Sequence, residues 1–297
     1  MNSAAVPPAL AHDEVVSPVH CRRCGYNLYG LRADGQCPEC GLETWESVLH
    51  TVDPAASRLP KLRDPARVGS ALLSLTVFLL IGAAVLATRP LAGWVEKLDP
   101  TGRWALAAHV PAEFTFLAAA AAVGGLWSLR GLDPERGIGE QGAVWRRGIW
   151  LLAWVLAVGV VVATVAARLE AVFPLSPAAD VLRLSLAVPA VIGLLGLQGI
   201  LGVIGLRSRE YRTARGGRQG ITAMVAATMG LAAGGLIRLL GLSQSLGGLA
   251  TLGAVIGLIS TLMLLIGLAY LVVNVWWIRR ALHRPPPELS EILGRRA

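Results

Sequence analysis

Long blocks of apolar residues without charge are the feature that most limits how this chain can fold. A helix needs about 20 such residues to cross a membrane, and Val68–Thr88, Gly148–Ala167 and Leu184–Leu206 each reach about that length with no charged residue. Only 15% of all residues are charged, against about 25% in a typical soluble domain. The sequence therefore predicts an all-α polytopic membrane bundle.

Three further spans bring the expected number of transmembrane helices to about six. One begins within residues 104–111 and ends at Leu129, and another covers 219–237. The charge-free run 239–278 is too long for a single span. We expect its helix to begin near Gly248, after a short polar loop.

The distribution of Lys and Arg predicts the orientation of these helices. If the amino terminus lies inside, the cytoplasmic segments carry 21 of the 27 basic residues. Such a bias follows the positive-inside rule, and it explains the net charge of +8 without nucleic acid. We therefore predict a multi-pass protein of the inner (cytoplasmic) membrane, in contact with the lipid bilayer, with both termini in the cytoplasm.

A polar head before the first span holds all four cysteines of the chain. Cys21-x-x-Cys24 and Cys37-x-x-Cys40 have the paired spacing with which thiolates surround a tetrahedral metal ion. In a reducing cytoplasm, paired thiols more often bind metal than form disulfides. The pattern predicts a site for Zn²⁺, with iron as the alternative. A four-cysteine shell leaves no open coordination position for catalysis.

Each cysteine pair is followed by glycine, which tolerates the positive φ of a tight turn. The runs Cys21–Tyr26 and Cys37–Gly41 resemble the knuckles of a zinc ribbon. The run Cys24–Leu31 (CGYNLYGL) is similar to amino-terminal zinc-ribbon modules on bacterial multi-pass membrane proteins. This resemblance covers roughly 20–44 and implies a small, metal-stabilised β module without a particular activity.

Two other functions compete with a structural, protein-binding role for this module. The same knuckles resemble rubredoxin, an iron protein that carries electrons, but the stretch between the two pairs is shorter here. A small-solute transporter is the other alternative. Nucleic acid is disfavoured, because the charges from His20 to Thr44 sum to zero and phosphate binding needs a basic surplus.

Few residues inside the apolar blocks suggest chemistry. His109 and Glu113 are the ionisable candidates, but Glu113 also suits the first turn of a helix, where a carboxylate meets the positive dipole end. Arg238 is expected to extend its charge to the membrane surface. The pairs Gly230-x-x-x-Gly234 and Gly253-x-x-x-Gly257 favour close helix packing.

The sequence contains no recognisable catalytic motif, so an enzyme is not the favoured interpretation. We expect a scaffold or protein-interaction role, with a protein partner bound through the ribbon. The predicted organisation is a disordered amino terminus (1–19), a zinc ribbon (20–44), a linker (45–66), a six-helix transmembrane domain (67–280) and a cytoplasmic tail (281–297).

Overall fold

A computed structural model of the chain describes most of its residues and divides into two compact units. One unit combines the head, residues 1–61, with the end of the chain from His283, and the other spans Leu62–Leu282. The described residues are 6–10, 12–57, 59, 62–98, 101, 116–132, 139–172, 181, 184–214 and 220–294.

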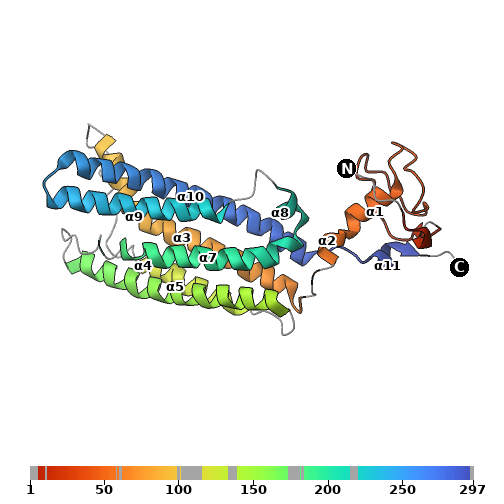
Figure 1. Cartoon of the computed structure of the whole chain (residues 1–297), viewed down its shortest axis with the longest axis horizontal. Helices are drawn as coiled ribbons and strands as arrows, with labels where there is room; N and C mark the ends of the chain where they lie inside the picture. Colours follow the sequence, from red (N-terminus) through yellow and green to blue (C-terminus); the bar gives the residue numbers. More distant parts are fainter. Residues whose placement is uncertain are drawn as a thin grey trace. The chain divides into compact units, whose positions relative to one another are not determined.

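The larger unit is a bundle of long helices that run alongside one another (Figure 1). Its main helices are α3 (Pro65–Leu98), α4 (Phe116–Leu129), α5 (Gly139–Val172), α7 (Ala187–Ile204), α9 (Ile221–Ser243) and α10 (Gly247–His283). Short helical turns follow α4 and α7 at η3 (Arg130–Leu132), η4 (Gly205–Arg207) and α8 (Arg209–Thr213).

Five segments of the described chain are long and apolar enough to cross a membrane. They are Pro65–Thr88, Gly142–Ala166, Ala187–Arg207, Ile221–Ser243 and Gly247–His283. The expected break in the last apolar run is confirmed, since α9 ends at Ser243 and α10 begins at Gly247. The remaining predicted span is represented by a shorter apolar helical segment, Phe116–Leu132. His109 and Glu113 fall outside the described residues.

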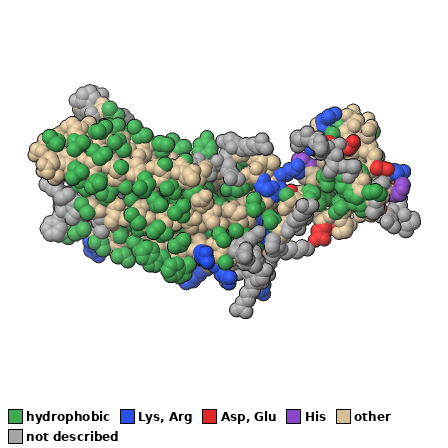
Figure 2. Space-filling view, viewed as in Figure 1, with side chains coloured by type: hydrophobic (Ala, Val, Ile, Leu, Met, Phe, Trp, Pro, Cys, Tyr) green, Lys and Arg blue, Asp and Glu red, His purple; other side chains and the backbone are tan. Residues whose placement is uncertain are grey.

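The outer surface of the bundle is apolar, as a lipid-facing surface must be. Trp127 and Trp150 expose 70% and 69% of their surface, and Figure 2 shows hydrophobic side chains spread over the whole visible face of the bundle. Soluble proteins rarely leave such large apolar patches exposed. The fold is therefore that of a membrane protein.

The helices close into a ring in chain order. Helices α3 and α4, α4 and α5, α5 and α7, and α7 and α9 are packed neighbours. Glycines bring α9 against α10, and a Cβ added at Gly69 of α3 would lie 3.1 Å from the Cα of Arg279 in α10. The first and last helices of the bundle are thus adjacent.

The smaller unit has little regular structure of its own. It contains η1 (Pro8–Leu10), β1 (Glu14–Val15), α1 (Thr44–Val52), α2 (Pro54–Ser57), α11 (Leu289–Ile292) and β2 (Leu293–Gly294). Strands β1 and β2 pair antiparallel, with Glu14 opposite Gly294 and Val15 opposite Leu293. The described sheet therefore joins the two ends of the chain instead of forming a long hairpin between the cysteine pairs.

The head takes in more of the chain than residues 20–44. Val15 and Val19, from the segment expected to be disordered, are 0% and 2% exposed. Trp45 and Val48, from the segment expected to be a linker, are buried on α1. These side chains complete a hydrophobic cluster with Leu28 and the cysteines, because the knuckles alone offer too few apolar groups to form a core.

Candidate metal centre

The two cysteine pairs lie on turns that share one backbone pattern. In the first, the N–H of Cys21 donates to the carbonyl of Tyr26 at 2.7 Å, and the N–H of Gly25 donates to the carbonyl of Cys21 at 2.9 Å. In the second, Cys37 and Gly41 make the equivalent bonds at 2.8 and 2.9 Å. The head therefore contains two copies of one turn.

Glycine allows each turn to close. Gly25 and Gly41 have φ angles of +79° and +69°, with no other atom within 4 Å of an added Cβ. The requirement for glycine is thus conformational and not steric, as the sequence predicted. In each turn the left-handed residue directs the chain back, so that a backbone N–H two residues after the second cysteine faces its sulfur, from Tyr26 to Cys24 and from Leu42 to Cys40.

The turns bring all four sulfurs together. The Sγ atoms of Cys21 and Cys40 are 3.5 Å apart, those of Cys24 and Cys37 are 3.6 Å apart, and all four lie within 4.8 Å of one another. A disulfide would need about 2.0 Å. A tetrahedron of sulfurs about 2.3 Å from a central zinc has edges of about 3.8 Å. The geometry therefore fits a tetrahedral metal ion, and the four thiols could hold one.

The electrostatics of the sulfurs also favour a cation. Burial raises the pKa of Cys21, but hydrogen bonds from the backbone N–H groups of Cys24 and Arg23 outweigh it and lower the pKa to about 6. The backbone N–H of Tyr26 lowers the pKa of Cys24, but burial and the neighbouring sulfurs raise it to about 12. Without a cation, the cluster does not hold four thiolates at neutral pH, so metal binding must displace protons.

Neighbouring groups hold the two turns in place. The guanidinium of Arg23 donates to the carbonyl of Cys40 at 3.3 Å, from one turn to the other. The backbone N–H of Arg22 donates to the hydroxyl of Ser47 at 3.3 Å, and its side chain pairs with Glu46 at 2.7 Å. Helix α1 is thereby fixed against the first turn.

The end of the chain also belongs to the head, which the sequence analysis did not predict. Ile292 and Leu293 are 1% and 6% exposed and lie in the same hydrophobic cluster as Cys21 and Cys37. The N–H of Val16 donates to the carbonyl of Ile292 at 2.8 Å. The available signal was the group of apolar residues Leu289, Ile292 and Leu293, which follows three prolines in a tail that is otherwise polar.

The chain was compared with protein-family models, with curated proteins and with solved structures, and none of the three comparisons finds a match. The assignment of the site therefore depends on its own geometry.

Proposed function

We propose that this chain is a multi-pass protein of the cytoplasmic membrane in which a structural zinc ribbon clasps the two ends of the polypeptide. The clasp keeps β1 and β2 together as a scaffold for a protein partner, without catalysis. Cys21, Cys24, Cys37 and Cys40 are the proposed zinc ligands. The observation that carries this proposal is the pairing of β1 with β2 beside the cysteine turns.

The tail segment is held mainly by its side chains. Two residues of strand pairing form too small a sheet to be stable alone. Burying Ile292 and Leu293 adds about 1.5–3 kcal/mol for each side chain. The cluster that receives them includes Cys21 and Cys37, so loss of the metal would also loosen the tail's binding surface.

Within the bundle, the beginning of α3 lies beside the end of α10. Gly69, near the start of α3, lies against Arg279, near the end of α10, and the Nε of Arg279 donates to the hydroxyl of Ser70 at 3.4 Å. The start of α3 and the end of α10 are therefore neighbours within the bundle. Short connections raise the effective concentration of the tail at the head, which offsets the entropy of closing so long a loop.

Charges and aromatic residues support the proposed orientation. The guanidinium of Arg130 lies 4.5 Å from the ring centre of Trp127, and that of Arg279 lies 5.2 Å from that of Trp276. Trp127 lies near the end of α4 with Arg130 in η3, and Trp276 and Arg279 lie near the end of α10. Both pairs are at the end of the bundle where α3 begins. Tryptophan is enriched at both membrane interfaces, which places this end of the bundle at one of them, and the excess of basic residues favours the cytoplasmic one.

The clasp is tested on the purified full-length protein by metal analysis and hydrogen exchange. We expect one zinc per chain and slow exchange of the Val16 amide, which bonds to the tail. Ile292→Asp should speed exchange at Val16, because it places a charge in the apolar cluster. Ser290→Asp adds the same charge at an exposed position of the tail and should leave exchange unchanged.

Different outcomes test the role of the metal and the existence of the clasp. A red, iron-loaded and redox-active head would replace the structural role with electron transfer. Fast exchange at Val16 in the zinc-loaded wild type would overturn the clasp while leaving the metal site intact.

The orientation has its own test, because every cysteine of the chain lies in the head. After chelation, a membrane-impermeant thiol reagent should label inverted vesicles and leave right-side-out spheroplasts unlabelled. The reverse pattern would place the head outside.

A further inference from the structure

The interior of the helix ring is solid at one end and hollow at the other. The solid end lies where α3 begins and α10 ends, and it is filled by side chains that are 1% exposed or less, including Leu72, Leu75, Ile204, Leu271 and Ile278. The hollow end lies where α9 turns into α10. There a cavity of about 390 Å³ is lined by residues of all six helices of the ring.

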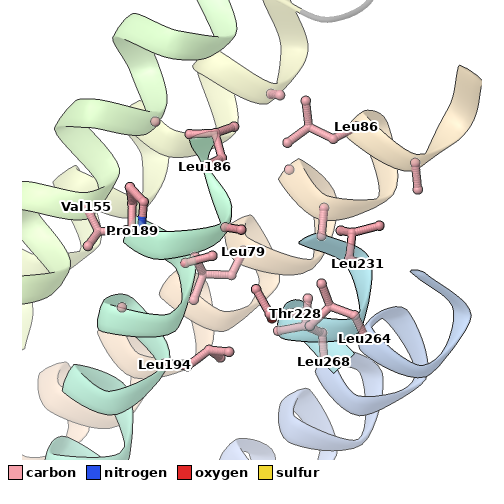
Figure 3. A pocket seen from close by; sticks show the side chains of 18 of the residues that line it. Leu79, Leu86, Val155, Leu186, Pro189, Leu194, Thr228, Leu231, Leu264 and Leu268 are labelled. Carbon is pink, nitrogen blue, oxygen red and sulfur yellow. The ribbon is translucent and has the colours of Figure 1, made fainter. Parts of the chain in front are cut away.

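The cavity has the size of a site for a small molecule, since such sites span about 300–1,000 Å³. Figure 3 shows leucines of α3, α7, α9 and α10 arranged around the same space, with Val155 of α5 among them. The solid end closes the ring beyond Leu197 and Leu268, which line the cavity and are nearly fully buried. The hollow is therefore a pocket and not a pore among the described residues.

The polar lining groups offer almost nothing to a polar guest. The hydroxyl of Thr228 donates to the carbonyl of Met224 at 2.9 Å, and that of Thr261 donates to the carbonyl of Gly257 at 2.7 Å. Both donors are thus used within their own helices. A guest rich in hydrogen-bonding groups would lose its water without replacement, so the pocket favours a hydrocarbon.

One charged side chain, Arg238, lines the cavity among the described residues. It follows Thr228 by ten positions on α9, which corresponds to about 15 Å along the helix axis. Arg238 lies near the end of α9 and is exposed, whereas Thr228 is 1% exposed. The cavity is therefore apolar at depth and positively charged toward the end of the ring.

We propose that this cavity binds a hydrocarbon chain that ends in an anionic group, with the chain between the helices and the anion at Arg238. A free fatty acid and a phospholipid of the membrane share this chemistry. A guanidinium forms strong charge-assisted hydrogen bonds with a carboxylate or a phosphate. The proposal depends on neither the metal nor the orientation of the chain.

The test uses the full-length protein in an uncharged detergent with palmitic acid that carries a photoreactive diazirine. We expect crosslinks on lining residues such as Val155 and Leu264. Gly159 lines the cavity, and an added Cβ there meets no atom within 4 Å. The backbone at Gly159 therefore has room for a Cβ, and the ring of Gly159→Phe should occupy the cavity and abolish these crosslinks. The matched control is Gly202→Phe on α7, which also meets no atom within 4 Å and does not line the cavity.

The role of the anionic group is tested by changing the charge at Arg238 and the charge of the probe. Arg238→Gln should weaken binding of the fatty acid roughly tenfold or more, Arg238→Lys should restore most of it, and the methyl ester should bind both forms alike. Equal binding of acid and ester to the wild type would overturn the role of Arg238. Crosslinks confined to lipid-facing residues such as Val161, or unchanged labelling of Gly159→Phe, would overturn the site.

Extraction of the purified protein identifies the source of the ligand. One anionic phospholipid per chain, lost in Gly159→Phe, assigns the membrane as the source. One free fatty acid per chain, lost in the same variant, assigns a single-chain amphiphile. Equal lipid content in the wild type and in Gly159→Phe counts against the site.

Discussion

The head and the bundle reach a stable fold by different means. The head depends on a few residues whose identity is fixed, namely four cysteines and the glycines that follow each pair. The bundle depends on composition, because many apolar residues can fill its interior or face lipid. A substitution should therefore have a large effect in the head wherever it touches the metal site, and in the bundle only where backbones meet.

Cys37→Ser should have the largest effect in the molecule. Structural zinc contributes about 10–16 kcal/mol to small zinc domains, and a head of this size cannot replace that with core burial. We expect loss of the metal and of hydrogen-exchange protection in the head, while the helical circular dichroism of the bundle persists. Pro38→Ser, an exposed change in the same turn, should keep the metal. If the head of Cys37→Ser lost the metal but kept its hydrogen-exchange protection, the head would not depend on the metal for its fold. The contrast with the bundle would then not hold.

The second-largest effect is expected in the bundle, where the backbones of α9 and α10 meet. A Cβ on Gly253 would collide with the backbone nitrogen of Arg238 and lie 2.6 Å from the carbonyl oxygen of Gly234, whereas a Cβ on Gly257 meets nothing within 4 Å. Gly253→Ala should destabilise the bundle by about 1–3 kcal/mol, as overpacking does.

Gly257→Ala is the matched control, since it makes the same chemical change in the same Gly-x-x-x-Gly pair. It should leave the thermal unfolding of the bundle in detergent unchanged. Equal effects of the two substitutions would mean that α9 and α10 do not approach at Gly253 as described.

These glycines illustrate what the sequence predicts and what it does not. The spacing of Gly253 and Gly257 indicates close packing, but only the position of α9 shows at which of the two an added side chain would collide. The length of the charge-free run and the polar loop within it likewise place the break near Gly248 without specifying neighbours in the ring. Such contacts depend on the relative rotation of two helices, which a local pattern does not contain.

The same distinction applies to the head. The four cysteines are predicted from their spacing alone, because each turn is local. The pairing of Val15 with Leu293 is not, since these strands are two residues long and lie at opposite ends of the chain. Strands this short have no recognisable alternation, so only the fold reveals the tail as part of the head's core.

Gly41→Ala should have a moderate effect on zinc affinity. It tests whether the head requires the left-handed backbone conformation at this glycine. A left-handed backbone costs a residue with a Cβ about 1–2 kcal/mol, and space is not limiting at φ +69°. We expect roughly tenfold weaker zinc affinity in competition with a chelator. Gly41→Asn should recover part of the loss, because asparagine tolerates this conformation better than alanine. Equal affinities of wild type and Gly41→Ala would show that the turn does not depend on its glycine.

The smallest effect should come from the ion pair between Arg22 and Glu46, although it joins the metal turn to α1. Both side chains are partly exposed, at 38% and 25%, and surface pairs are worth about 0–1 kcal/mol. Arg22→Gln removes the charge but keeps the backbone N–H that donates to Ser47. Hydrogen exchange of the head should therefore change little. If Arg22→Gln released α1 or the metal, the head would depend on its surface charges as much as on its cysteines and glycines.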